Sequence, residues 1–212
     1  MTIDFIHADF HLGKLDVSDL DTDPVEQFSK WYNEVQNAGI SEYYAMTLAT
    51  CSREGRPSAR IVYLRGFDSR GFAFYTNYNS RKGEELAQNP AASLCFYWKE
   101  VERQVRIEGM VERVSAEESD AYFAGRPLNN QLGAWASSQS GPLESAQALE
   151  ARVEQFRQQF AGASVPRPAH WGGFRLVPDR IEFWQGRPSR LHDRFVFVLG
   201  NDRHWTVGRI NP

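Results

Sequence analysis

The chain has 212 residues, of which 42% are hydrophobic and 13% aromatic, so it can bury a sizeable core and is not a disordered chain. We expect one domain spanning residues 1–212. The formal net charge of -3 excludes a global positive field for nucleic acid or for an anionic membrane surface. Two cysteines without ligand spacing, and the lack of a long apolar run, predict a cytoplasmic protein with no metal site and no membrane span.

The first part of the chain predicts an arm followed by a helix. Residues 1–22 are acidic and weakly periodic, which is typical of a mobile N-terminal arm. Asp23 and Pro24 then supply a helix N-cap and a first-turn proline. Apolar residues recur at helical spacing from there until Gly39, so we expect an amphipathic helix packed on a core.

Short strands follow, separated by turn signals. Apolar runs and period-two patterns predict strands at 44–51, 60–64, 71–77, 92–98 and 104–113. Five consecutive strands suggest an antiparallel meander, which closes most readily into a barrel because closure removes the exposed edges.

Helices and further strands complete the predicted fold. We expect helices at 80–88, 115–124 and 144–160, and strands at 173–183, 194–199 and 204–209. The fold class is therefore mainly β with flanking α-helices.

Two cationic stretches suggest anion binding. Arg60 and Arg65 bracket a predicted buried apolar run and can address two different anions, although two solvated strand ends fit the same pattern. Ser80 can cap a helix whose first turn carries Arg81 and Lys82. Cations at that position work against the helix dipole, and a bound phosphate explains their placement.

Several polar residues are candidates for recognition of a heterocycle or a phosphate. Gln104 offers an amide that both donates and accepts, and the pair Gln139 and Ser140 suits a loop near a ligand. The spacing of four residues aligns Tyr122, Arg126 and Asn130 on one face of a helix, but Pro127 makes an unbroken helix unfavourable.

The C-terminal stretch 181–195 combines an aromatic face at Trp184 with Arg190, His192 and Arg194. Planar guanidinium groups suit phosphate or carboxylate, and the histidine titrates near neutral pH. A solvated hairpin end is the structural alternative. The chain contains no Walker loop, GxGxxG, HExxH or GxSxG motif, which weighs against the nucleotide-binding and hydrolase classes that these motifs define.

The order Trp184-Gln185-Gly186 followed by Arg190-Leu191-His192-Asp193-Arg194 resembles the C-terminal signature of the pyridoxamine (pyridoxine) 5'-phosphate oxidases. The resemblance extends over residues 23–212 and implies an FMN-binding split β-barrel that forms a homodimer with FMN at the subunit interface. It also implies FMN-dependent oxidation of pyridoxine 5'-phosphate and pyridoxamine 5'-phosphate to pyridoxal 5'-phosphate, with O2 reduced to H2O2, in vitamin B6 salvage.

The same resemblance assigns roles to individual residues. It implies FMN contacts at Arg60, Ile61, Val62, Tyr63, Leu64, Arg65, Tyr75, Thr76, Arg81, Lys82, Gln104, Gln139, Ser140, Trp184 and Arg194. Substrate contacts are implied at Arg65, Tyr122, Arg126, Asn130, Arg190 and His192, the last two being the catalytic pair.

The chain departs from the family pattern in three places. Arg65 stands where lysine is common, and Asn130 where serine is common. The stretch from His7 to Phe10 replaces an Arg-Arg-Glu-Tyr segment that covers the substrate in some members. Two alternatives to the leading function therefore stay open: a related FMN oxidase for another flat anionic substrate, of the phenazine-precursor type, and a non-catalytic carrier of flavin or pyridoxal phosphate.

Overall fold

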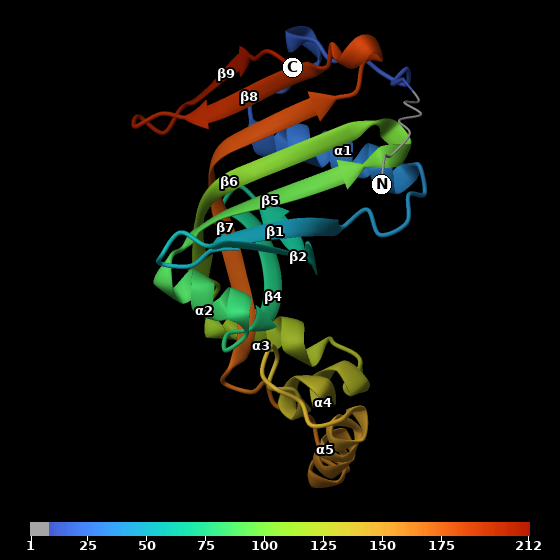
Figure 1. Cartoon of the computed structure of the whole chain (residues 1–212), viewed down its shortest axis with the longest axis vertical. Helices are drawn as coiled ribbons and strands as arrows, with labels where there is room; N and C mark the ends of the chain where they lie inside the picture. Colours follow the sequence, from blue (N-terminus) through green and yellow to red (C-terminus); the bar gives the residue numbers. More distant parts are fainter. Residues whose placement is uncertain (1–8) are drawn as a thin grey trace, which may run out of the picture. The chain divides into compact units, whose positions relative to one another are not determined.

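The structure is a computed structural model, and it describes residues 9–212 (Figure 1). The chain divides into two compact units. The first comprises residues up to 48, 93–109 and 178–212, and the second comprises 49–92 and 110–177. Among the described residues, no helix has both the length and the apolar character that a membrane span requires.

The strands are β1 (Ala45–Cys51), β2 (Pro57–Tyr63), β3 (Gly66–Asp68), β4 (Gly71–Asn77), β5 (Ala91–Trp98), β6 (Arg103–Arg113), β7 (Trp171–Gln185), β8 (Asp193–Leu199) and β9 (Trp205–Arg209). In the described part of the chain they form one nine-stranded sheet with the order β2-β1-β5-β6-β7-β4-β3, to which β8 and β9 are added through β7. The pairs β3–β4, β4–β7, β7–β8 and β8–β9 are antiparallel. The predicted mainly β class is confirmed.

The predicted meander is wrong in strand order, because β7 lies between β6 and β4. This strand is 15 residues long, so its two halves pair with different partners. In the second unit Tyr75 of β4 lies opposite Gly173, and in the first unit Trp184 lies opposite Arg194 of β8. Local alternation predicts a strand but not its partner, which is why the order was missed.

In the first unit, helix α1 (Pro24–Asn37) forms where the sequence predicts it. The carboxylate of Asp23 accepts a hydrogen bond from the backbone N–H of Val25 at 2.7 Å, which is the expected N-cap. Phe28 and Val35 are fully buried, and Phe28 packs against Phe96 of β5. The amphipathic pattern therefore reports the packed face of the helix.

The second unit contains helices α2 (Arg81–Gln88), α3 (Ala116–Ala124), α4 (Leu128–Ala136) and α5 (Ala146–Gln159). Figure 1 shows α3, α4 and α5 grouped together. A hydrophobic cluster of Phe123, Leu132, Val165 and Trp171 holds this group. The sequence did not predict α4, which begins directly after Pro127 and separates from α3 at the expected break.

Strand β2 corrects a second expectation. The apolar run after Arg60 was expected to be buried, but the side chains of Ile61 and Tyr63 are 63% and 39% exposed, and only Leu64 is fully covered. The side chains of β2 alternate between exposed and half-buried, so one of its two faces is open. Ile61 and Tyr63 lie on this face.

Candidate functional site

A cavity of about 850 Å³ lies in the second unit. Fifteen of the residues predicted to contact cofactor or substrate belong to this unit. Eleven of them line the cavity, and Arg60, Leu64, Arg81 and Ser140 do not. The predicted residues in its lining are Ile61, Val62, Tyr63, Arg65, Tyr75, Thr76, Lys82, Tyr122, Arg126, Asn130 and Gln139. Four of the six implied substrate contacts, Arg65, Tyr122, Arg126 and Asn130, are therefore brought to one cavity.

The break at Pro127 does not separate the predicted trio. Tyr122 lies on α3, Arg126 lies in the turn and Asn130 lies on α4, and all three line the same cavity. The turn is closed by Gln131, whose side-chain amide donates to the backbone carbonyls of Phe123, Ala124 and Arg126. Convergence thus arises from a capped turn and not from a continuous helix face.

Aromatic rings form a stack beside these groups. Tyr75 of β4 and Tyr122 of α3 are stacked with ring centroids 3.8 Å apart, and Trp171 of β7 is stacked with Tyr75 at 5.8 Å. Burial, with the nearby Glu118 carboxylate, raises the pKa of Tyr75 to about 12. The Tyr75 phenol therefore stays protonated and is a hydrogen-bond donor at neutral pH.

Arg126 is the residue of the cavity whose contacts best fit an anion. Its guanidinium lies over the Trp171 ring at 4.4 Å. Among the buried side-chain nitrogen and oxygen atoms of residues 9–212, Nη1 of Arg126 is the one without a hydrogen-bond partner. Burial lowers the pKa of Arg126, and the charge of Arg65 lowers it further. A buried cationic donor without a partner costs free energy, and an anion bound in the cavity removes that cost.

Lys82 connects helix α2 to the loop that carries Gln139. Its Nζ donates to Gln139 Oε1 at 2.9 Å, to Thr76 Oγ1 at 3.1 Å and to Ser80 Oγ at 3.2 Å. The neighbouring Ser140 has a φ of 70°, so the loop turns sharply there. Burial and the charge of Arg60 lower the pKa of Lys82 to about 8.

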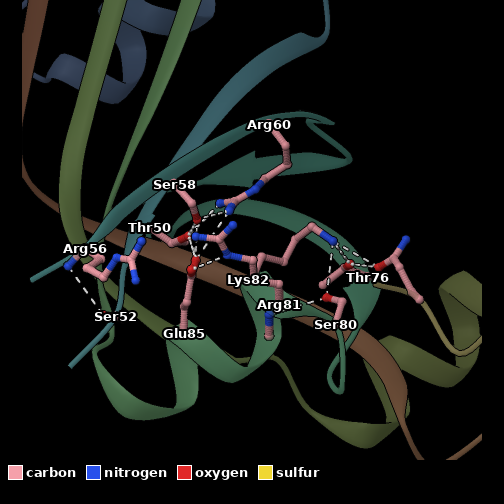
Figure 2. Close-up of polar contacts among 12 residues, drawn as sticks. Thr50, Ser52, Arg56, Ser58, Arg60, Thr76, Ser80, Arg81, Lys82 and Glu85 are labelled. Atoms are coloured by element: carbon pink, nitrogen blue, oxygen red, sulfur yellow. Dashed lines mark hydrogen bonds and ion pairs between the residues drawn. The ribbon is translucent and has the colours of Figure 1, made fainter. Parts of the chain in front are cut away.

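Arg60 and Arg81 share a carboxylate that sequence reasoning missed. Glu85 of α2 is 6% exposed and lies between the two guanidinium groups, with Thr50 and Ser58 beside it (Figure 2). Burial raises the pKa of Glu85, but hydrogen bonds from Ser58, Thr50 and Arg81 outweigh burial and lower it to about 2. A glutamate inside a helix has no distinguishing local signal, so only the fold shows this position.

The first unit contains the remaining predicted residues. Trp184 and His192 pack with ring centroids 4.6 Å apart. The backbone N–H of Arg187 donates to His192 Nδ1 at 3.1 Å, so the neutral imidazole carries its proton on Nε2. Burial, followed by the charge of Arg190, lowers the pKa of His192. At neutral pH this side chain therefore presents an Nε2–H donor.

Asp193 follows His192 in sequence but does not orient it. Its carboxylate accepts hydrogen bonds from the backbone N–H of Leu15 at 3.1 Å, from Arg187 at 3.0 Å and from Arg209 at 2.8 Å. These contacts join the N-terminal region, the turn after β7 and strand β9. The role of Asp193 is therefore to hold the turn that carries His192.

Arg194 is fully engaged by the protein. Its Nε and Nη2 donate to the carboxylate of Glu182 at 2.9 and 3.1 Å, and its Nη1 donates to the carbonyl of Asn211 at 2.8 Å. Arg194 is thus held in one orientation by its own unit.

Two further predicted residues belong to this unit. Arg190 lies in a left-handed turn with a φ of 62°, and Gln104 lies half-buried on β6.

The described part of the predicted arm, residues 9–22, belongs to the first unit. Phe10 makes edge contacts with Trp184 and with His192, each with ring centroids 5.5 Å apart. Asp9 accepts a hydrogen bond from the backbone N–H of Ser189 at 2.9 Å. His7 and Ala8, which the sequence comparison also singled out, lie outside the described residues. The aromatic residue at position 10 therefore covers part of the predicted catalytic turn.

Comparison with known proteins identifies the family. Residues 33–160 match the sequence model of the pyridoxamine 5'-phosphate oxidases, and residues 171–212 match that of the pyridoxine 5'-phosphate oxidase C-terminal dimerisation region. The chain belongs to the pyridoxamine 5'-phosphate oxidase family. The predictions of this family and of an oxidoreductase enzyme are confirmed.

Curated relatives match over nearly their whole length. A pyridoxine/pyridoxamine 5'-phosphate oxidase of Paraburkholderia phymatum is 56% identical over 211 residues, covering 100% of this chain and 99% of the relative. One of Trichormus variabilis, with the same name, is 51% identical over 211 residues, again covering 100% and 99%.

Two solved structures share the fold. PhzG from Burkholderia lata 383, in complex with tetrahydrophenazine-1-carboxylic acid, has a TM-score of 0.88 and 31% identity, covering 94% of this chain and 100% of that one. A pyridoxamine 5'-phosphate oxidase-related, FMN binding protein from Nostoc punctiforme has a TM-score of 0.73 and 19% identity, covering 91% and 100%. The predicted split-barrel fold is confirmed.

Proposed function

We propose that the chain is a cytoplasmic, homodimeric, FMN-dependent oxidase that converts pyridoxine 5'-phosphate and pyridoxamine 5'-phosphate to pyridoxal 5'-phosphate, with O2 reduced to H2O2. The observation that carries the substrate class is the unpaired, buried Nη1 of Arg126 in the second-unit cavity. A phosphate monoester satisfies this donor, and Arg65, Tyr122 and Asn130 line the same cavity. The names of relatives at 51–56% identity support the same assignment.

The donor set of the second unit fits the phosphate group of FMN. Arg60, Arg81 and Lys82 are grouped around α2, whose N-terminal backbone amides favour anions. Bound FMN supplies hydride acceptance and subsequent reaction with oxygen. The chain's own residues supply charge neutralisation at the phosphate and the aromatic and polar lining of the cavity.

The remaining predicted residues have roles that their contacts support. Trp184 offers a flat surface, Gln104 offers an amide, and Arg194, held by Glu182, keeps a fixed positive charge. Arg190 would orient the substrate, and His192 would donate a hydrogen bond through Nε2. Because phosphate binding fixes the substrate, these groups act on a reactant that is already oriented.

Two observations support a homodimer. Residues 171–212 match a dimerisation region, and Ile61 and Tyr63 on β2 are exposed apolar side chains. We propose that FMN lies at the subunit interface, where residues of both copies contact it. A homodimer also covers the open face of β2.

A second candidate is oxidation of a phenazine precursor, which the similarity to PhzG favours. That substrate class carries a carboxylate, as the bound molecule named for PhzG does. The lower identity of 31% with PhzG, against 51–56% with the B6 enzymes, ranks this candidate second. A carrier without turnover is the third outcome that an assay has to separate.

An aerobic turnover assay tests the proposal. The purified flavoprotein is given pyridoxine 5'-phosphate, pyridoxamine 5'-phosphate, unphosphorylated pyridoxine or tetrahydrophenazine-1-carboxylic acid. The account expects pyridoxal 5'-phosphate and H2O2 in equal amounts from the two phosphates, and little turnover of the other compounds. Preferential oxidation of the phenazine compound would replace the leading proposal by the second, and no turnover of any of them would indicate a carrier.

A further inference from the structure

We propose that Glu85 is a positioning residue for the FMN phosphate, because it holds Arg60 and Arg81 together and sets the direction of both guanidinium groups. The inference rests on the proposed FMN site and goes beyond it, since Glu85 itself is not expected to contact the cofactor. A carboxylate beside an anion site normally weakens binding through its charge. The contacts of Glu85 indicate that its effect on the two arginines is larger.

Both carboxylate oxygens of Glu85 accept hydrogen bonds (Figure 2). Its Oε1 accepts from Arg81 Nε at 2.9 Å. Its Oε2 accepts from Thr50 Oγ1 at 2.5 Å and from Ser58 Oγ at 2.6 Å, and lies 3.4 Å from Arg60 Nη2. This carboxylate therefore contacts four side chains, which come from β1, β2 and α2.

The two hydroxyl groups link Glu85 to Arg60 a second time. Arg60 Nη1 donates to Thr50 Oγ1 at 2.6 Å, and Arg60 Nη2 donates to Ser58 Oγ. Each hydroxyl thus accepts from Arg60 and donates to Glu85, which fixes the direction of both bonds. With two guanidinium donors and two hydroxyl donors directed at it, position 85 needs acceptors on both side-chain branches.

Glutamine does not satisfy this arrangement. A carboxylate has two acceptor oxygens, whereas an amide has one acceptor and one donor group. If the amide oxygen of a glutamine at position 85 faces Arg81, its NH2 group faces Arg60 Nη2. The two guanidinium groups, which repel each other, then also lose the negative charge between them.

The two arginines lie on the more exposed side of Glu85, where they can bind an anion. Glu85 binds Arg81 through Nε, so the two terminal nitrogens of Arg81 remain for an acceptor outside the cluster. The Arg81 side chain is 63% exposed and that of Arg60 is 20% exposed, against 8% for Glu85. The carboxylate is thus behind the cations, where it orients them without occupying the surface that a phosphate would meet.

The test compares Glu85→Gln with Glu84→Gln. Glu84 is the next residue on α2 and is exposed, so its substitution removes the same charge without touching the arginines. Apo-protein of each variant and of the unchanged chain is titrated with FMN and with riboflavin, and binding is followed by quenching of flavin fluorescence. Riboflavin lacks the phosphate and reports any general damage to the ring site.

We expect Glu85→Gln to weaken FMN binding about tenfold or more, while riboflavin affinity changes less than about twofold. Glu84→Gln should leave FMN affinity unchanged or slightly improved, because it only removes a repulsive charge. In an Arg81→Ala background, the effect of Glu85→Gln on FMN affinity should shrink, since one of the two arginines that it positions is gone.

A second variant covers the case in which Glu85→Gln does not fold. Ser58→Ala removes one hydroxyl between Glu85 and Arg60 without leaving a buried charge alone, and it should give a smaller, FMN-selective loss of about threefold.

Three results would overturn the inference. They are FMN affinity of Glu85→Gln equal to or tighter than that of Glu84→Gln, equal losses for FMN and riboflavin, and an undiminished effect in the Arg81→Ala background. If the unchanged chain itself does not bind FMN, both the proposed function and this inference are wrong. If the unchanged chain binds FMN and one of the three results above is found, only the inference about Glu85 is wrong.

Discussion

The backbone N–H of Arg187 donates a hydrogen bond to Nδ1 of His192 at 3.1 Å. The neutral ring accepts this bond, but the protonated ring has no lone pair on Nδ1 and loses it. Burial, followed by the charge of Arg190, lowers the pKa of His192, and the loss of this hydrogen bond on protonation acts in the same direction. Stability from this bond is present above the ordinary histidine pKa and is lost as pH falls through the lowered one.

From this relationship we predict an acid limb in the pH profile of kcat/KM, with its midpoint below the ordinary pKa of histidine. His192→Gln keeps a side-chain N–H donor but cannot titrate. The variant should lose the acid limb and keep activity within about tenfold at pH 8, since a hydrogen bond of about 1 kcal/mol is at stake. If the acid limb persists in His192→Gln, another group is responsible for it.

Asp193→Asn should lower the free energy of unfolding and have little effect on turnover. Its carboxylate holds Leu15, Arg187 and Arg209, so the substitution weakens contacts with two cations in a buried position. We expect the free energy of unfolding to fall by about 1–3 kcal/mol, measured by denaturant titration, while the acid limb stays where it is. A turnover loss above about a hundredfold with unchanged stability would instead give Asp193 a direct role.

Arg126→Met should separate stability from substrate binding. The change removes a half-buried cation whose buried Nη1 has no hydrogen-bond partner among residues 9–212, so the melting temperature of the ligand-free protein should stay the same or rise. The KM for pyridoxine 5'-phosphate should rise about 10- to 100-fold, because a hydrogen bond to a charged group contributes about 1.5–3 kcal/mol.

The matched control is Arg152→Met. Arg152 is on α5, where its Nε donates to the backbone carbonyl of Ala148 in the same helix, and it does not line the cavity. Both substitutions remove one positive charge from the second unit. An equal change of KM in the two variants would exclude a specific contact between Arg126 and the substrate phosphate.

The lowered pKa of Lys82 predicts that FMN affinity depends on pH in the alkaline range. Its pKa is lowered to about 8 by burial and by Arg60, and a bound phosphate dianion favours the protonated form. Binding therefore takes up a proton above about pH 8, and FMN affinity should decline as pH rises from there, by at most about tenfold per pH unit. Lys82→Arg keeps its charge over this range and should flatten the decline, whereas a flat profile in the unchanged chain would contradict the role.

Local patterns in the sequence were enough to predict several elements. The N-cap of α1 at Asp23 and the alternation of β6, with Val105 and Ile107 fully buried, were both visible. These features depend on residues within one turn or one strand. The resemblance to the family then supplied the candidate site residues, and the structure places eleven of them around one cavity.

Long-range arrangement is what the sequence did not reveal. The insertion of β7 between β6 and β4 depends on pairing across about a hundred residues. The same holds for Glu85, whose partners Thr50 and Ser58 come from two other strands. The open face of β2 was missed because an apolar run reads alike whether a core or a partner subunit covers it.

The central claim is that this chain oxidises a B6 phosphate by passing a hydride to bound flavin. The most direct measurement is the visible spectrum of the purified protein without oxygen, before and after addition of pyridoxine 5'-phosphate. The account predicts a flavin band that bleaches on addition and returns with air as pyridoxal 5'-phosphate appears. A bound flavin that stays oxidised with both pyridoxine and pyridoxamine 5'-phosphates would contradict it.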